Sequence, residues 1–225
     1  MDKTAVYERY FELLVEANKK FNLTAIVERD AVFSLHFKDS AAAAHLLFPG
    51  ARVLDIGSGA GFPGMVLAIE RPDCEFVLME ATGKKCVFLQ QTATVLGLNN
   101  VQVVHARAEL LRAGNMTAGR QRGAAPLANL LGKTGNGITE RAGNNVAAGL
   151  ADFVVSRAVG ALPLLIKWGF PYLKSGGELI AWKTDGREVE DCAKILQKLG
   201  GKILAVEKYS LADRDRVLIR VSRQV

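Results

Sequence analysis

The feature that most constrains this chain is a glycine-rich decapeptide, Asp55–Gly64, whose sequence is DIGSGAGFPG. It directly follows the apolar run Arg52–Leu54 and precedes a segment with a helical pattern. Glycine is needed where the backbone turns sharply or approaches a ligand closely, and the first turn of a helix offers unpaired N–H groups. The decapeptide therefore predicts a strand–turn–helix unit that binds a ligand at one edge of a parallel sheet.

The spacing of these glycines indicates the type of ligand. A dinucleotide-binding turn has the pattern GxGxxG, whose third glycine lets the helix pack closely on the strand, but Phe62 occupies that position here. The chain instead has DxGxGxG, with Asp55 before Gly57, which is typical of class I methyltransferases. We expect S-adenosylmethionine as the cofactor, in contact with Gly57 and Gly59. A glycine-rich turn without a ligand is the alternative.

Two acidic positions further along the chain favour the cofactor site. Glu80 ends the second apolar run, where a carboxylate can accept hydrogen bonds from both ribose hydroxyls. Ala108 and Glu109 follow the third run, where backbone groups and a carboxylate can meet the edge of an adenine. Both acids can alternatively be solvated charges, but ligands bind at the carboxyl ends of strands in such sheets.

Short apolar runs alternate with helical patterns through most of the chain. The expected strands are Arg52–Ile56, Glu75–Met79, Val101–Val104, Asp152–Val155, Glu178–Trp182, Lys202–Tyr209 and Arg216–Arg223. The last two are separated by a polar turn and are expected to pair antiparallel. The alternation predicts an α/β, Rossmann-like class I methyltransferase fold with a mostly parallel seven-stranded sheet and helices on both faces.

The chain is expected to have a helical extension, one main domain and one insertion. Residues 1–48 form the N-terminal helical extension, and residues 49–225 form the domain that binds S-adenosylmethionine. Residues 112–150 are rich in Gly, Asn and Ala and carry a formal charge of +4, which predicts a flexible insertion with a non-specific attraction for RNA.

Composition limits the cellular setting. A formal charge of +6 is compatible with an anionic partner such as RNA without requiring one. No apolar run approaches the roughly 18–20 residues of a membrane span, and the charged N-terminus does not resemble a secretory signal. The 3 cysteines are not clustered with one another or with histidines. We therefore expect a cytoplasmic protein with reduced thiols, no metal site and no membrane partner.

The chain resembles the bacterial 16S rRNA guanine-N7 methyltransferases. The resemblance is carried by Phe21–Thr24, His36–Ser40, Asp55–Gly64, Gly83–Lys85, Ala108-Glu109 and the Ser-Arg-Ala tripeptide Ser156–Ala158. It implies a cytoplasmic enzyme that uses S-adenosylmethionine to methylate N7 of one guanine in 16S rRNA, within the small ribosomal subunit. It also places Gly57, Phe62, Ala108, Glu109 and Arg157 in contact with the cofactor.

The chain departs from that family at several places. Glu80 stands where the family usually has Asp, and Lys183-Thr184 where it usually has Lys-Gly. The N-terminal helical region is shorter than in many relatives, and residues 112–150 replace a brief loop. These differences leave the cofactor site intact and concern how RNA docks.

Several charged residues have two interpretations. Arg157 follows a buried strand and is expected to bind either the methionine carboxylate of the cofactor or an RNA phosphate; a structural salt bridge is the alternative. Lys183 and Lys84 are candidate substrate contacts, or plain surface lysines. His36 and Asp39 lie on one face of a helix, which favours a structural pair in the pocket wall over a catalytic pair.

No catalytic side chain is expected if guanine N7 is the acceptor, because N7 carries a lone pair and no proton. The target base is expected to leave its stack, supported by Phe62 or Trp182. A monomer that binds 16S rRNA or the small ribosomal subunit is the favoured interpretation. The alternatives are a class I methyltransferase for a small molecule or protein, a nicotinamide dehydrogenase, and an RNA-binding module without activity.

Overall fold

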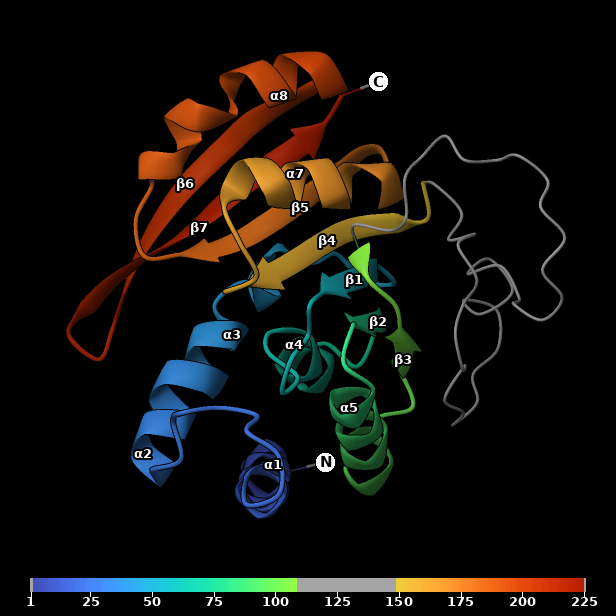
Figure 1. Ribbon diagram of the computed structural model, residues 1–225, viewed down its shortest axis with the longest axis vertical. Coiled ribbons are helices and arrows are strands. Elements are labelled where there is room, and N and C mark those ends of the chain that lie inside the picture. The colour runs from blue at the N-terminus through green and yellow to red at the C-terminus, as the bar shows by residue number, and fades with distance from the viewer. Residues whose placement is uncertain (1, 109–148, 225) are drawn as a thin grey trace, which may run out of the picture.

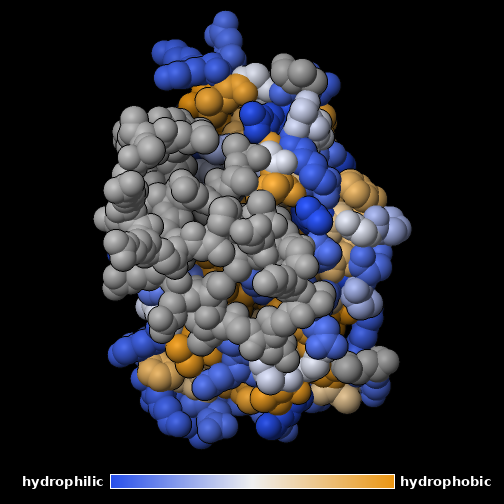
Figure 2. Space-filling model, turned by 90° about the vertical axis from the view of Figure 1, so that its right-hand side faces the viewer, coloured by the Kyte–Doolittle hydropathy of each residue, from blue (hydrophilic) through white to orange (hydrophobic). Residues whose placement is uncertain are grey.

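The computed structural model describes residues 2–108 and 149–224 (Figure 1). Glu109 and nearly all of the expected insertion at 112–150 lie outside the described residues. Within the described part of the chain, no helix combines the length and the apolar character that a membrane span requires. Where Figure 2 shows described residues, hydrophilic side chains and smaller hydrophobic areas both reach the surface.

Seven strands form one sheet in the order β3-β2-β1-β4-β5-β7-β6. The strands are β1 Arg52–Ile56, β2 Glu75–Glu80, β3 Val101–His105, β4 Ala151–Arg157, β5 Leu173–Lys183, β6 Gly201–Leu211 and β7 Arg214–Arg223. Strands β1 to β5 pair parallel, whereas β7 runs antiparallel to both β5 and β6. The predicted class I methyltransferase architecture, with an antiparallel pair at one end, is confirmed.

Helices cover both faces of the sheet (Figure 1). On one face lie α4 Gly64–Glu70 and α5 Gly83–Val95, joined by the N-terminal helices α1 Lys3–Asn18, α2 Arg29–Val32 and α3 Asp39–Ala41. On the other lie α7 Leu162–Gly169 and α8 Ala193–Leu199. Short 3₁₀ helices cover Ala44–Leu46, Phe170–Tyr172 and Arg187–Cys192. Each face buries its own hydrophobic cluster, as the apolar strands require.

The helical segment that carries His36 and Asp39 is not a single regular α-helix. It continues from α2 into a π-helical stretch, Phe33–Lys38, before α3. Such widened turns shift the phase of side chains and are frequent at functional sites. Helix α8 and the preceding 3₁₀ turn were not assigned from the sequence.

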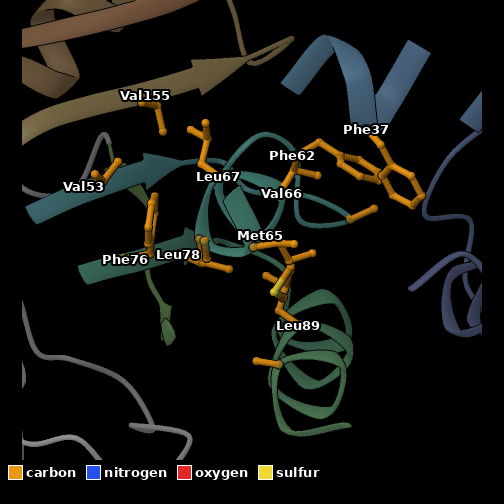
Figure 3. Close-up of a cluster of buried hydrophobic side chains, with 14 of the residues drawn as sticks. Phe37, Val53, Phe62, Met65, Val66, Leu67, Phe76, Leu78, Leu89 and Val155 are labelled. Carbon is orange, nitrogen blue, oxygen red and sulfur yellow. The ribbon is translucent and has the colours of Figure 1, made fainter. Parts of the chain in front are cut away.

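The N-terminal helices share the core of the sheet domain. Tyr10 and Phe37 are buried and stack with each other, with ring centroids 5.2 Å apart. Both contact Phe62 of the glycine-rich turn, Tyr10 at 5.7 Å and Phe37 at 5.9 Å between centroids. Figure 3 shows Phe37 pointing toward Phe62, with Met65 and Leu89 nearby. Residues 1–48 therefore fix the position of the turn.

We predict that Gly61→Ala destabilises the protein by about 3 kcal/mol or more. Gly61 has φ +99, and an added Cβ would collide with the hydroxyl of buried Tyr10 and lie 3.0 Å from Met65 Cβ. Gly176→Ala is the matched control, because Gly176 has φ +77 but no atom within 4 Å of such a Cβ. The control should lose only about 1–2 kcal/mol in urea unfolding. Equal losses would contradict the prediction.

Candidate functional site

A cavity of about 530 Å³ opens where β1, β2 and β4 end. Residues of the N-terminal segment, the glycine-rich turn, the strand ends and α7 line it. They include Leu23, Thr24, His36, Gly57, Gly59, Phe62, Glu80, Lys85, Ala108, Arg157, Val159 and Trp168. The carboxyl ends of parallel strands are where open α/β sheets bind ligands. No group of three or more His, Cys, Asp or Glu side chains suited to a metal ion occurs among residues 2–108 and 149–224.

The glycine-rich turn forms one wall of the cavity. Gly57 has φ +71, and an added Cβ would lie 2.6 Å from Val159 Cγ2. A larger residue at this position would therefore push the turn away from Val159. Ala158, which precedes Val159, has φ +57, a left-handed conformation that is strained for alanine. The glycine-rich turn therefore lies close to Val159, which directly follows the Ser-Arg-Ala tripeptide.

Asp55 anchors the turn from beneath. Its side chain is fully buried, and Oδ2 accepts a hydrogen bond from the Gly64 N–H at 3.0 Å, at the start of α4. Oδ1 has no hydrogen-bond partner among the described residues. Burial raises the pKa of Asp55 to about 7, against the lowering effect of the hydrogen bond from the Gly64 N–H. A hydrogen-bond donor or a positive charge next to Oδ1 would stabilise the ionised form of the Asp55 carboxyl group.

Glu80 joins the end of β2 to the turn. Its Oε2 accepts a hydrogen bond from the Gly59 N–H at 2.9 Å, and its Oε1 accepts one from the Thr82 N–H at 2.8 Å. Each carboxylate oxygen has a further lone pair, so these bonds leave the carboxylate able to accept hydroxyl donors from the cavity that it lines. Glu80 thus holds both the turn and the entry to α5.

Arg157 lies at the end of β4 and is held by the N-terminal segment. Its Nη1 donates to Asp39 Oδ2 at 2.8 Å and to the Leu35 carbonyl at 3.0 Å. Asp39 Oδ1 accepts a hydrogen bond from the Tyr209 hydroxyl at 2.7 Å. The guanidinium carbon also lies 5.1 Å from the centroid of the Phe62 ring. The salt bridge that was one interpretation of Arg157 is present, and the residue still lines the cavity.

The same arginine determines the tautomer of His36. Arg157 Nη2 lies 3.0 Å from His36 Nδ1, and because a guanidinium only donates, Nδ1 must be the acceptor. The proton of the neutral ring is then on Nε2, which lies 2.8 Å from Thr24 Oγ1. Burial, followed by the charge of Arg157, lowers the pKa of His36 to about 4. His36 is therefore a neutral member of the cavity wall.

The predicted substrate contacts Lys84 and Lys183 are not among the residues that line the cavity. Lys84 extends its ammonium to 5.7 Å from the centroid of the Phe21 ring, whereas its neighbour Lys85, which was not a predicted contact, lines the cavity. Lys183 donates to the Gly160 carbonyl at 2.5 Å and to Glu188 at 3.0 Å, and it does not line the cavity.

The two aromatic residues expected to support a base are both buried. Phe62 lies under the His36 ring at 4.5 Å between centroids, and Trp182 donates its indole N–H to the Asp39 carbonyl at 2.8 Å. Phe62 and Trp168 both line the cavity, but Trp182 does not, and Trp168 was not assigned from the sequence. Its helical position among apolar neighbours gave no signal that distinguished it from a core residue.

Comparison with known sequences identifies close relatives. The sequence model of a protein family described as "rRNA small subunit methyltransferase G" matches residues 3–131. Ribosomal RNA small subunit methyltransferase G of Syntrophomonas wolfei is 35% identical over 217 residues, which cover 95% of this chain and 87% of that protein. The protein of the same name from Lactococcus lactis subsp. cremoris is 35% identical over 222 residues, covering 96% and 80%.

Comparison with solved structures supports the fold. The crystal structure of M. jannaschii TYW2 in complex with AdoMet superimposes with a TM-score of 0.57 at 15% identity, covering 84% of this chain and 76% of that one. A SAM-dependent O-methyltransferase from Thermotoga maritima gives a TM-score of 0.52 at 17% identity, covering 94% and 71%. At this identity the likeness concerns the fold alone.

We predict that His36 makes the protein less stable in acid. Below pH 6.5 the unfolded chain protonates this histidine, whereas the folded chain protonates it only near pH 4. The stability that depends on neutral His36 is therefore complete above pH 6.5 and is lost as the pH falls toward 4. Between about pH 7 and pH 4.5 the wild type should lose about 2–3 kcal/mol more than His36→Gln.

Urea unfolding of both proteins at the two pH values measures this difference. The buried Asp55 has a raised pKa and therefore changes stability in the opposite direction, but it is present in both proteins and cancels in the comparison. Identical losses in the wild type and His36→Gln would show that His36 is not held neutral.

Proposed function

This chain belongs to the rRNA small subunit methyltransferase G family, and from that premise we propose that it transfers the methyl group of S-adenosylmethionine to N7 of a guanine in 16S ribosomal RNA. The observation that carries the proposal is that the glycine-rich turn and the segment of the Ser-Arg-Ala tripeptide lie together at the cavity. Gly57 of the glycine-rich turn and Val159, next to the Ser-Arg-Ala tripeptide, meet there.

The residues of the cavity fit S-adenosylmethionine. Gly57 and Gly59 let the backbone come close to a ligand, and Glu80 offers acceptor capacity to ribose hydroxyls. The unpartnered Oδ1 of Asp55 places a buried carboxylate next to the turn, which favours a ligand with a positive charge. Ala108 lines the cavity at the end of β3, where the adenine edge is expected.

Phe62, Glu109 and Arg157 complete the proposed cofactor contacts. Phe62 lines the cavity and stacks with the His36 ring. Glu109 directly follows Ala108 in the sequence. Arg157 uses three of its donor contacts within the protein. A guanidinium has five N–H groups, so it keeps donors for the carboxylate of the cofactor or for an RNA phosphate.

The bound cofactor supplies a methyl group activated by its sulfonium. The chain then has to position the guanine and needs no base, because N7 carries no proton. This agrees with the cavity: His36 is neutral but its Nδ1 is occupied by Arg157, and its Nε2 faces Thr24. The side chains described here orient the reactants and exclude water, which are the contributions expected of a positioning site.

Substrate contacts are proposed at the α5 side of the cavity. Lys84 and Lys85 open α5, and Lys85 lines the cavity. Lys183 remains a candidate only if it exchanges Glu188 for a phosphate, since Glu188 holds its ammonium at 3.0 Å.

The product tests the proposed function. The purified chain is incubated with S-adenosylmethionine carrying a labelled methyl group and with small ribosomal subunits or 16S rRNA that lack the modification. We expect the label in N7-methylguanosine after nuclease digestion, and strand scission at that guanine after reduction and aniline treatment. Label at an exocyclic amine or at carbon, or label only in protein or small molecules, would overturn the proposal.

We predict that Glu80→Gln weakens S-adenosylmethionine binding by about 1.5–3 kcal/mol, the scale of a hydrogen bond to a charged group. The amide oxygen replaces only one of the two acceptors that Glu80 offers to Gly59 and Thr82. Glu80→Asp, the shorter acid, should bind the cofactor better than Glu80→Gln. Titration calorimetry measures both, with NAD as the control ligand; NAD binding as tight as that of S-adenosylmethionine would contradict the assignment.

A further inference from the structure

The start of α5 carries an arrangement of charges that its own stability does not explain. Lys84 and Lys85 lie in its first turn, the first turn contains no acidic residue, and the preceding Thr82 makes no side-chain capping hydrogen bond. The N-terminus of a helix is the positive end of its dipole, where cations are unfavourable. Two lysines at this place gain nothing from the helix and are suited to attract an anion.

Two more lysines directly follow the neighbouring helix α1. Lys84 Nζ is 5.7 Å from the centroid of the Phe21 ring, which brings the start of α5 to the segment that follows α1. Lys19 and Lys20 directly precede Phe21, and both are exposed. Helix α1 also packs against α5, and Figure 1 shows the two side by side. We call Lys19, Lys20, Lys84 and Lys85 the basic rim.

The basic rim is continuous with the cavity. Lys85 lines the cavity on one side, and Leu23 and Thr24, which follow Phe21, line it on another. The Asn18 side chain fixes this turn: its Oδ1 accepts from the Leu23 and Thr24 N–H groups at 2.7 and 3.0 Å, and its Nδ2 donates to the Thr24 carbonyl at 3.0 Å. The rim is therefore held in a defined position at the mouth of the site.

The basic rim has no negative counterpart in the described chain. Other surface cations form ion pairs, such as Lys3 with Glu70 and Arg9 with Glu12. Across residues 2–108 and 149–224, none of the four rim lysines has a carboxylate within ion-pair distance. Helix α5 itself contains no Asp or Glu. Their charges are thus available to an external polyanion.

We propose that the basic rim binds the phosphates of a single-stranded RNA segment and leads it past Phe21 into the cavity. The proposal rests on the proposed function and adds where the RNA strand enters. Phosphate contacts of this kind set affinity and register without reading sequence. The Phe21 ring is partly exposed, lies next to the Lys84 ammonium and directly follows Lys19 and Lys20. An exposed aromatic ring beside cations can stack on a base, as in other single-strand binding sites.

The test measures how RNA affinity depends on salt. The wild type is compared with K19Q/K20Q, K84Q/K85Q and the control K194Q/K198Q, using a 16S rRNA fragment and potassium chloride. Lys194 and Lys198 are also exposed and unpaired with any carboxylate of the described chain, but they lie on α8, on the other face of the sheet (Figure 1). All three variants change the net charge equally, so a difference between them reports position.

Each phosphate contact on a single strand contributes about 0.7 to the slope of log K against log salt concentration. We expect each rim pair to reduce that slope by about 1.4 and the control pair to leave it unchanged. K19Q/K20Q should also keep the wild-type affinity for S-adenosylmethionine, because neither residue lines the cavity.

If methyl transfer to RNA continued but the salt slope of RNA binding were the same in the rim and control variants, the proposed role of the basic rim would be overturned. A slope change in all three variants would show a general charge effect and would also overturn it. If the wild type transferred no methyl group to RNA, the proposed function itself would fail, and the two failures are therefore distinguishable.

Discussion

The ion pair between Arg157 and Asp39 joins the N-terminal helical segment to the strands of the sheet. The two side chains are 2.8 Å apart and only 13% and 5% exposed. Asp39 also binds Tyr209 from β6 through its carboxylate and Trp182 from β5 through its carbonyl. Replacing such a pair by apolar residues often costs little, whereas removing one partner costs about 3–5 kcal/mol. Its main consequence is therefore geometric: it ties the N-terminal helix to three strands at the cavity.

That geometry explains why the N-terminal segment belongs to the site. Arg157 fixes the tautomer of His36, and His36 in turn holds Thr24 and covers Phe62. Thr24 lies in the turn that Asn18 clamps, so the hydrogen bonds run without interruption from the end of α1 to the end of β4. A chain in which residues 1–48 were merely appended would leave the arginine without its acceptors.

The sequence predicts those parts of the site that local structure determines. The glycine-rich turn and the position of Glu80 at a strand end follow from residue types and spacing, and the structure places both at the cavity. Which of Lys84 and Lys85 lines the cavity depends on how α5 is rotated about its axis. Two adjacent lysines in the sequence do not reveal that rotation. Lys183 was a candidate because it ends β5, but Glu188 binds its ammonium at 3.0 Å. This pairing depends on the 3₁₀ helix Arg187–Cys192, which was not predicted from the sequence.

The distribution of charge suits two ligands of opposite sign. Asp55 and Glu80 lie at the base of the glycine-rich turn, whereas Lys84 and Lys85 lie at the mouth on the α5 side. Because burial raises the pKa of Asp55 to about 7, this carboxyl is only partly ionised near neutral pH. A cationic ligand near it favours the ionised form and lowers that pKa.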